Sequence, residues 1–363
     1  MRLRLEPRTA ASQRMRYASP LIAAGLTLLT GFVLFAALGK NPLAAFYAFF
    51  VAPVSSVNGL AELFLKASPL VLIAIGLAVG FRGNVWNIGA EGQLTIGAIA
   101  GGGLALLPFF GDSPWLLPAM IAAGALGGMA WAAIPALLRT RFNANEILVS
   151  LMLTYVAQLL LSYLVHGPWR DPQGFNFPQS QALSEAALLP ILIEGTRLNA
   201  SVLFALAAVG AGWVFLSKSF RGYQMRVTGL ADAAARYAGF SAKRTIWIGM
   251  LAGGAAAGLA GVGEVAGPLG QLLPTVSPGY GFAAIIVAFV GRLNPVGILL
   301  AGLLMSLLYL GGDAAQISMG LPAATTALFQ GALLFFLLGA DVFINYRVRL
   351  VRSARGGARE AIA

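Results

Sequence analysis

The sequence predicts an all-α integral membrane protein with about ten transmembrane helices. Of the 363 residues, 58% are hydrophobic and only 10% are charged, whereas a soluble domain carries about 25% charged residues. The apolar residues also fall into ten runs, and about 20 consecutive apolar residues suffice for a helix to cross a bilayer. This composition excludes a cytosolic enzyme, a disordered chain and a secreted disulfide scaffold. The absence of cysteine excludes disulfides and thiolate metal sites.

The ten apolar runs follow one another along the chain. The first, residues 20–38, comes after five arginines but lacks a small-residue cleavage site, so we interpret it as a retained helix and not as a signal peptide. The run at 282–290 is too short to cross about 30 Å of hydrocarbon. It either extends towards Arg292 or continues a broken segment buried in protein. The remaining runs are 60–81, 86–110, 115–138, 147–165, 198–216, 245–262, 295–310 and 323–338.

The distribution of lysine and arginine predicts that both termini are cytoplasmic. With ten crossings, 20 of the 24 basic residues then lie on the inside and 4 on the outside. The net charge of +11 is therefore a topology signal, and membrane lipid is the expected contact and not nucleic acid. We expect a cytoplasmic tail over residues 1–17, one transmembrane domain over 18–340 with a cytoplasmic loop at 217–244, and a second tail over 341–363.

The sequence lacks the motifs of an enzyme. The only Gly-Lys pair, Gly39-Lys40, has no glycine five residues before it and is followed by Asn41, so no phosphate-binding P-loop is present. The single histidine, His166, cannot form a His-rich metal site. We therefore expect no catalytic residue, metal site or cofactor on this chain, and energy for transport must come from another chain or from an ion gradient.

The first informative stretch is Phe-Arg-Gly-Asn-Val-Trp-Asn-Ile-Gly-Ala-Glu-Gly-Gln at residues 81–93. Asn87 is typical of a helix N-terminus, and helical spacing would place it on one face with Glu91. A carboxylate inside the membrane is costly unless it is paired or near water. We predict that Asn87, Glu91, Gln93 and the other intramembrane acid, Glu264, line or brace the translocation route. For Glu91 two interpretations stay open, a group lining the pathway or a clamp on backbone N–H groups.

The second stretch, residues 226–240, is rich in alanine and predicts a short helix of about two turns. Asp232 lies near its start, where the helix dipole favours a carboxylate, Arg236 follows at i+4, and Gly239 ends it. The helix either rests on lipid headgroups or enters a protein groove, and its small apolar face favours the groove. The candidate residues of this helix are Gly229, Leu230, Asp232, Ala234, Ala235, Arg236, Tyr237 and Gly239.

The third stretch runs from Gly263 to Phe282 and contains Ser-Pro-Gly-Tyr-Gly-Phe at 277–282. Its glycines and prolines interrupt regular helix, and such backbone survives at membrane depth only when it is buried or faces a water-filled cavity. It is either a gate or cavity wall, or an ordinary external loop. The candidate gate residues are Pro278, Gly279, Tyr280 and Gly281. The glycine-rich stretches near Glu91 and Glu264 are weakly similar, which raises an internal repeat as a hypothesis.

These three stretches resemble the permease subunits of nucleoside-type ABC importers, which belong with the simple-sugar and branched-chain amino-acid permeases. The resemblance rests on residues 81–93, 235–239 and 277–282, followed by Gly-Arg-Leu-Asn-Pro at 291–295, and it extends over about residues 20–340. The Asn-x-Gly-x-Glu-Gly-Gln stretch favours the nucleoside branch over the ribose branch. The sequence departs from relatives at Ala231, where asparagine is expected, and at the plain pair Ala283 and Ala284.

The resemblance implies a multi-pass permease of the bacterial inner membrane that imports nucleosides. It implies a second permease subunit, commonly a paralogue, and an extracytoplasmic substrate-binding lipoprotein or protein. It also implies ABC ATPase subunits on the inside, which would hold ATP and Mg and receive the 217–244 loop as a coupling helix. A sugar importer of the same architecture is the first alternative, and an ion-driven secondary transporter or channel is the second.

Overall fold

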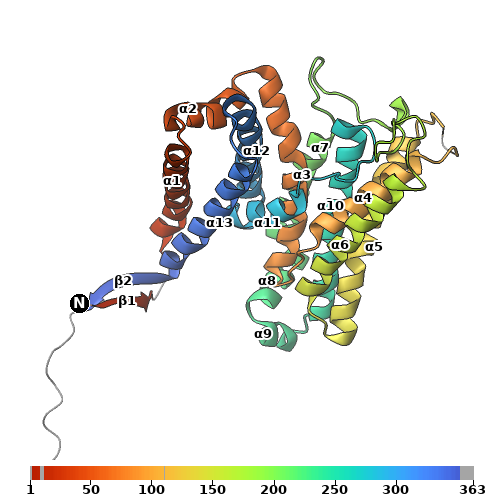
Figure 1. Ribbon diagram of the computed structural model, residues 1–363. Coiled ribbons are helices and arrows are strands. Elements are labelled where there is room, and N and C mark those ends of the chain that lie inside the picture. Colours follow the sequence, from red (N-terminus) through yellow and green to blue (C-terminus); the bar gives the residue numbers. More distant parts are fainter. Residues whose placement is uncertain (1, 9–11, 110, 352–363) are drawn as a thin grey trace, which may run out of the picture. The chain divides into compact units, whose positions relative to one another are not determined.

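The computed structural model describes residues 2–8, 12–109 and 111–351, and helices make up most of it (Figure 1). The elements in chain order are β1 (Arg2–Pro7), α1 (Gln13–Ala37), α2 (Pro42–Phe46), the π-helix η1 (Tyr47–Val51), the 3₁₀-helix η2 (Ala52–Val54), α3 (Val57–Arg82), α4 (Ala90–Ala105), α5 (Leu116–Phe142), α6 (Glu146–His166), the 3₁₀-helix η3 (Glu185–Ala187), α7 (Ser201–Lys218), α8 (Phe220–Leu230), α9 (Asp232–Tyr237), α10 (Ala242–Glu264), the π-helix η4 (Val265–Leu269), α11 (Tyr280–Val290), α12 (Pro295–Met319), α13 (Ala324–Asn345) and β2 (Tyr346–Val351).

Each of the ten predicted apolar runs contains a helix, and the prediction of an all-α membrane protein is confirmed. In the described part of the chain, eight helices are long and apolar enough to cross a membrane. α11 is short, as its sequence predicts. The prediction of a full-length span at 86–110 is wrong, because α4 has 16 residues and covers only about 24 Å. The short apolar helices between Pro42 and Val54 were not predicted.

The chain divides into two compact units, residues 1–47 with 315–363 and residues 48–314. In the first unit α1 packs against α13, where Gly31 allows close approach of the Phe329 ring. Phe329 also contacts Phe35, and the Ser19 hydroxyl donates a hydrogen bond of 2.6 Å to Asp341. β1 and β2 pair antiparallel within this unit. Of the two predicted tails, residues 1, 9–11 and 352–363 lie outside the described residues.

Small residues set the packing of the second unit. α10 lies against α3, α4 and α5, and a side chain at Gly258 would collide with the backbones of Gly124 and Gly128, while one at Gly97 would collide with the backbone of Gly258. Glycine at these crossings lets helix backbones approach closely, which is the usual way in which helices associate inside a membrane. The glycine-rich sequence of α10 is therefore a packing surface.

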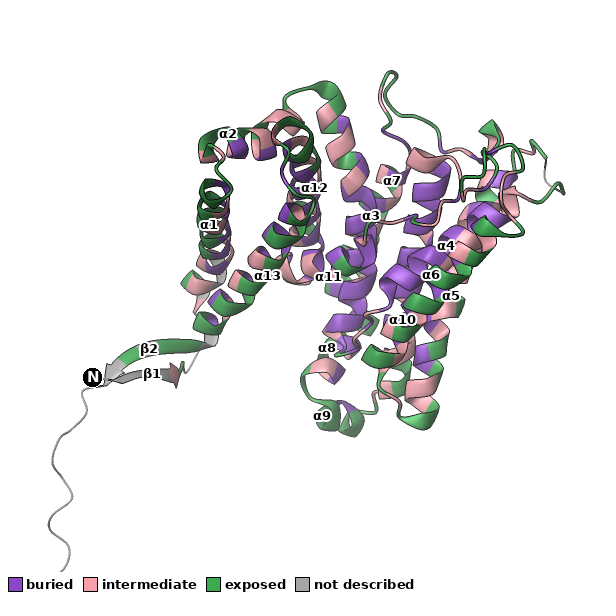
Figure 2. Ribbon diagram, viewed as in Figure 1, coloured by how far each residue is buried: buried purple, intermediate pink, exposed green. Residues whose placement is uncertain are grey.

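The inner helices of this unit are mostly buried, whereas the outer helices expose much of their surface (Figure 2). In α3, 83% of the residues in its apolar 18-residue segment are buried, whereas in the corresponding segment of α6 the share is 22%. α5 and α6 carry exposed large apolar side chains such as Leu126 and Leu159. An exposed apolar surface of this kind suits lipid or another membrane subunit.

Candidate functional site

A break in the helical structure separates α3 from α4. Asn84 adopts a left-handed conformation with φ of 54°, and residues 85–89 are not helical. Asn87 and Gln93 bond to each other through their amide groups at 2.8 and 3.0 Å, and the Asn87 oxygen also accepts from the Gly89 N–H. The predicted shared helix face of Asn87 and Glu91 is wrong, because α4 begins only at Ala90.

Glu91 lies in the first turn of α4 and is buried, with 2% of its surface exposed. Its carboxylate accepts a hydrogen bond of 2.7 Å from the backbone N–H of Gly281, in the first turn of α11. The turn before α11, with Ser277 and Gly279, lies close to the same carboxylate. Because a side chain at Gly281 would collide with the backbone of Glu91, the N-termini of α4 and α11 are in direct contact. The positive ends of two helix dipoles therefore meet at one carboxylate.

Further contacts join the first stretch to the rest of α11 and to the turn that follows it. Phe289 of α11 stacks on Phe81 and on Trp86, with ring centroids 5.2 and 5.8 Å apart. Arg82 donates to the Leu293 carbonyl at 2.8 Å, in the turn that connects α11 to α12. Two segments almost 200 residues apart in sequence thus form one site.

The second stretch is also in contact with the first. Gly229 lies so close to the carbonyl of Arg82 and the N–H of Asn84 that it has no room for a side chain. Gly229 and Leu230 belong to α8 and not to the predicted short helix, since the helix is interrupted at Ala231. All three sequence stretches therefore meet around residues 81–91.

The short helix itself is α9, and its end signals are as predicted. Arg236 forms an ion pair of 2.7 Å with Asp232, and Gly239 has φ of 79° just after the helix. Tyr237 is 96% exposed and Leu230 79% exposed, and Ala234 is exposed as well. Ala235 is buried within the chain's own fold. α9 thus presents Ala234 and Tyr237 outward and anchors itself through Ala235.

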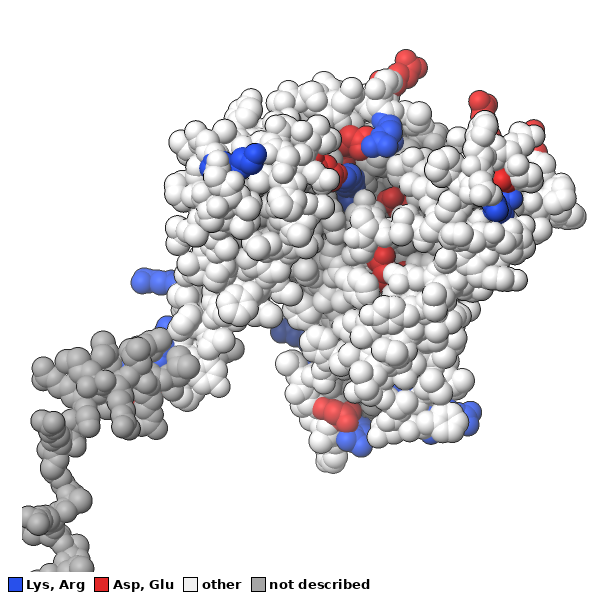
Figure 3. Space-filling model, viewed as in Figure 1, with Lys and Arg blue, Asp and Glu red and all other residues white. Residues whose placement is uncertain are grey.

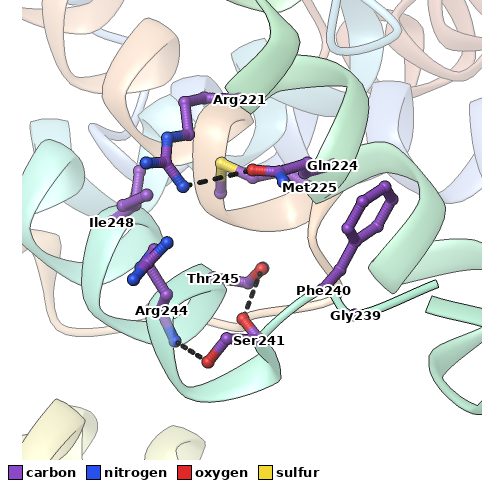
Figure 4. Close-up of a pocket in the computed structure, with 9 residues that line it drawn as sticks. All are labelled: Arg221, Gln224, Met225, Gly239, Phe240, Ser241, Arg244, Thr245 and Ile248. Atoms are coloured by element: carbon purple, nitrogen blue, oxygen red, sulfur yellow. Dashed lines mark hydrogen bonds between the residues drawn. The ribbon is translucent and has the colours of Figure 1, made fainter. Parts of the chain in front are cut away.

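A small pocket lies between α8 and the start of α10, next to α9 (Figure 4). Its volume is ≈ 30 Å³. Figure 4 shows Arg221 and Arg244 on the same side of this pocket, with Arg221 bonded to Gln224. None of the residues that line it is acidic. The surface beside α9 is therefore basic.

A second group of charged side chains lies at the opposite end of α3. Glu62 receives two hydrogen bonds from Arg197, of 2.7 and 2.8 Å, and Lys66 pairs with Asp313 at 2.6 Å. The bond from Glu62 raises the pKa of Arg197, so this guanidinium stays charged at any physiological pH. Charged side chains are sparse and grouped on the otherwise uncharged surface (Figure 3). A pocket of ≈ 320 Å³ is lined by Glu62 and Arg197 together with Asn58.

Glu264 ends α10 and lines a cavity with Ser68 of α3 and Ser201 of α7. It is 8% exposed and lies within electrostatic range of Lys66 and Arg197. It is also within range of Tyr280, the first residue of α11. The structure thus places Glu264 near the charged group of Glu62, Arg197 and Lys66 and Glu91 at the helix break, and Asn87 and Gln93 form a pair of their own.

Sequence reasoning missed Ser68 and Ser201. Each is a single small polar residue within or beside an apolar run, and only the fold reveals that both face Glu264. Pro278, Gly279 and Gly281 form the turn that caps α11, where the Ser277 hydroxyl accepts from the N–H groups of Gly279 and Tyr280. No cluster of three or more His, Cys, Asp or Glu residues that could hold a metal occurs in residues 2–8, 12–109 and 111–351.

Comparison with known proteins places the chain in a family. Residues 59–338 match the family described as the branched-chain amino acid transport system permease component. The chain belongs to this family. Its membership confirms the predicted transport permease, as opposed to an enzyme, and the several apolar helices make it a multi-pass membrane protein.

The chain is 38% identical to the glucose ABC transporter permease protein of Haloferax volcanii, over 99% of this chain and 97% of the relative. It is 30% identical to the guanosine ABC transporter permease protein of Bacillus subtilis, over 92% and 94%. It is 29% identical to a nucleoside ABC transporter permease protein of Lactococcus lactis, over 88% and 89%. A second permease protein from each of these organisms also matches the chain, at 27 to 30% identity.

Proposed function

We propose that this chain is the permease subunit of an ABC importer that carries nucleosides across the cell membrane. The observation that carries the proposal is the family match over residues 59–338, together with near full-length similarity to guanosine and nucleoside permeases. The helix break held by Glu91 supports it, because irregular backbone at membrane depth is tolerated where it is buried in protein or lines a route for solute.

Glucose is the second candidate substrate. The relative with 38% identity over 99% of the chain is a glucose permease, and this match is stronger than those to the nucleoside permeases. Both solutes are rings rich in hydroxyl groups, so the same permease architecture can serve either.

The proposed partners are ABC ATPase subunits that hold ATP and Mg, a substrate-binding protein outside, and a second permease subunit. The second permease is a paralogue in this proposal, because each of three organisms contributes two matching permeases. The ATPase docks at α9, whose exposed Tyr237 and Ala234 offer a small protruding surface next to the basic pocket. This arrangement puts α9 and both termini on the cytoplasmic side.

An uptake assay tests the proposal. The chain is expressed with the ATPase, second permease and binding protein encoded beside it, in a cell that lacks nucleoside and glucose uptake. Import of labelled guanosine or glucose that stops on ATP depletion, while the ion gradient is preserved, supports the proposal. Import that instead follows the ion gradient would assign the chain to secondary transport, and import of neither solute would refute the proposed substrates.

A further inference from the structure

Glu264 is a buried acid with no hydrogen-bonding partner among the described residues. It is 8% exposed, and neither a backbone group nor a side chain in the described part of the chain donates a hydrogen bond to its carboxylate. Leaving a buried charged acceptor unpaired costs several kcal/mol, more than a neutral group would. Such a group in a transport protein calls for a partner that is not part of the chain.

The hydroxyl groups of the two serines beside Glu264 can accept hydrogen bonds, but their own protons are already donated elsewhere. The Ser68 hydroxyl donates its one proton to the Leu65 carbonyl at 2.8 Å. The Ser68 and Ser201 oxygens are 3.1 Å apart, so Ser201 must supply the proton of that bond. Both protons are then used, while lone pairs remain on Ser68 and Ser201. The cavity therefore presents the carboxylate and hydroxyl oxygens, and a ligand must bring the donors.

The cations around Glu264 are already paired with other acids. Lys66 and Arg197, the cations nearest to Glu264, are bound to Asp313 and Glu62 respectively. Tyr280 also lies within electrostatic range, and its hydroxyl has no hydrogen bond to any described residue. Its ring meets that of Tyr309 edge to face, with centroids 5.7 Å apart. An acid and two serines thus line one cavity, and Tyr280 lies within electrostatic range of the acid.

We propose that Glu264, Ser68 and Ser201 form a binding site for a hydroxyl group of a polyhydroxylated ring solute. The carboxylate and serine oxygens accept the solute's hydroxyl protons. The inference rests on the proposed import function and holds for ribose or hexose rings alike. The cavity volume of ≈ 10 Å³ fits one hydroxyl or water, so one hydroxyl of the solute enters it and the ring itself stays outside.

Variants of the complete transporter test the site. Glu264→Gln removes the charge and keeps the shape, so guanosine or glucose import should fall by about 10- to 100-fold, the range of a charge-assisted hydrogen bond. Ser201→Ala should cost less, and the double variant should lose less than the product of the two effects, because both groups serve one hydroxyl. Asp112→Asn removes an exposed acid and is the matched control with unchanged import.

Deoxy analogues supply a readout that a structural role would not change. Guanosine or glucose is compared with analogues that each lack one hydroxyl, using the same binding protein throughout. The wild type should import one analogue markedly less well than the parent solute. Glu264→Gln should lose this discrimination and import both at similar rates. An unchanged ratio in Glu264→Gln would overturn the site even if import itself falls.

Labelling provides a second measurement that does not depend on Glu264 variants folding. The chain has no cysteine, so Ser201→Cys carries a single thiol for a methanethiosulfonate reagent. Guanosine or glucose should slow its labelling in the working transporter, and equal rates with and without solute would overturn the site. Sodium-dependent import that becomes sodium-independent in Glu264→Gln would instead assign a cation site. A wild type that imports neither solute contradicts the proposed function, whereas an unchanged ratio contradicts only this inference.

Discussion

Replacing Glu91 by leucine should destabilise the protein, and replacing it by glutamine should be largely tolerated. The reason is the position of the carboxylate, which accepts the Gly281 N–H at 2.7 Å in the first turn of α11. The first N–H groups of a helix have no partner within the helix. Leucine fills a similar volume but accepts no hydrogen bond, so it isolates the cap from any effect of packing.

The hydrogen-bond network sets the size of the effect. After Glu91→Leu, the Gly279 N–H still has the Ser277 oxygen at 3.1 Å. The Gly281 N–H has no such substitute, and a buried unsatisfied donor costs about 1–3 kcal/mol. Loss of the charge between two helix N-termini adds about 0.3–2 kcal/mol. Glutamine keeps an acceptor oxygen for Gly281 and should cost only about 1 kcal/mol.

Thermal unfolding of the purified transporter in detergent, with the amount of protein in the membrane, measures this difference. The expected order of stability is wild type, then Glu91→Gln, then Glu91→Leu, and Asp112→Asn should match the wild type. If glutamine is stable and keeps the wild-type solute preference, the carboxylate acts as a brace. A leucine variant as stable as the wild type would refute the capping argument. A stable glutamine variant with altered solute preference would assign Glu91 to the solute.

Three further predictions concern topology, coupling and packing. A cysteine at Gln181 should react with an impermeant thiol reagent added outside intact cells and one at Tyr237 should not, and the reverse pattern would overturn the proposed orientation. Ala234→Glu adds a bulky charge to the exposed face of α9 and should lower uptake with normal membrane insertion, whereas unchanged uptake would favour a helix that rests on lipid. Gly258→Val should lower the protein level and the unfolding temperature, by at least about 1–3 kcal/mol of overpacking, because it collides with the α5 backbone. Gly210→Val, with nothing within 4 Å of its added carbon, should change neither quantity, and equal behaviour of the two variants would contradict the packing argument.

The sequence predicts the helices of this protein well, because apolar runs near 20 residues long are a strong signal. It does not predict that the run at 86–110 is broken before Ala90. Nothing in that run is charged beyond Glu91, and its one asparagine, Asn87, suits either a cap or a turn. The partner that makes the break stable, the Gly281 N–H, lies 190 residues away. Local sequence carries no information on a contact of that separation.

In the α9 segment, too, the sequence predicts the local contacts but not the contacts with other elements. Asp232, Arg236 and Gly239 act locally, through the helix dipole, an i+4 pair and a left-handed turn, and their predicted geometry agrees with the structure. Ala235 and Gly229 depend on other elements, since one is buried in the chain's own fold and the other packs on Arg82. Their environment could not be deduced from alanine-rich composition.

Contacts between the three sequence stretches form a continuous physical connection across the second unit. α9 follows α8, whose Gly229 rests on the backbone of Arg82 and Asn84. The same segment leads to Glu91, which holds the start of α11, and α11 begins with Tyr280 beside Glu264. Close-packed backbone contacts without intervening side chains transmit small displacements, because neither surface can yield without a clash. Backbone contacts and one carboxylate therefore connect α9 to the start of α11, and the glycines at these contacts leave no room for a side chain.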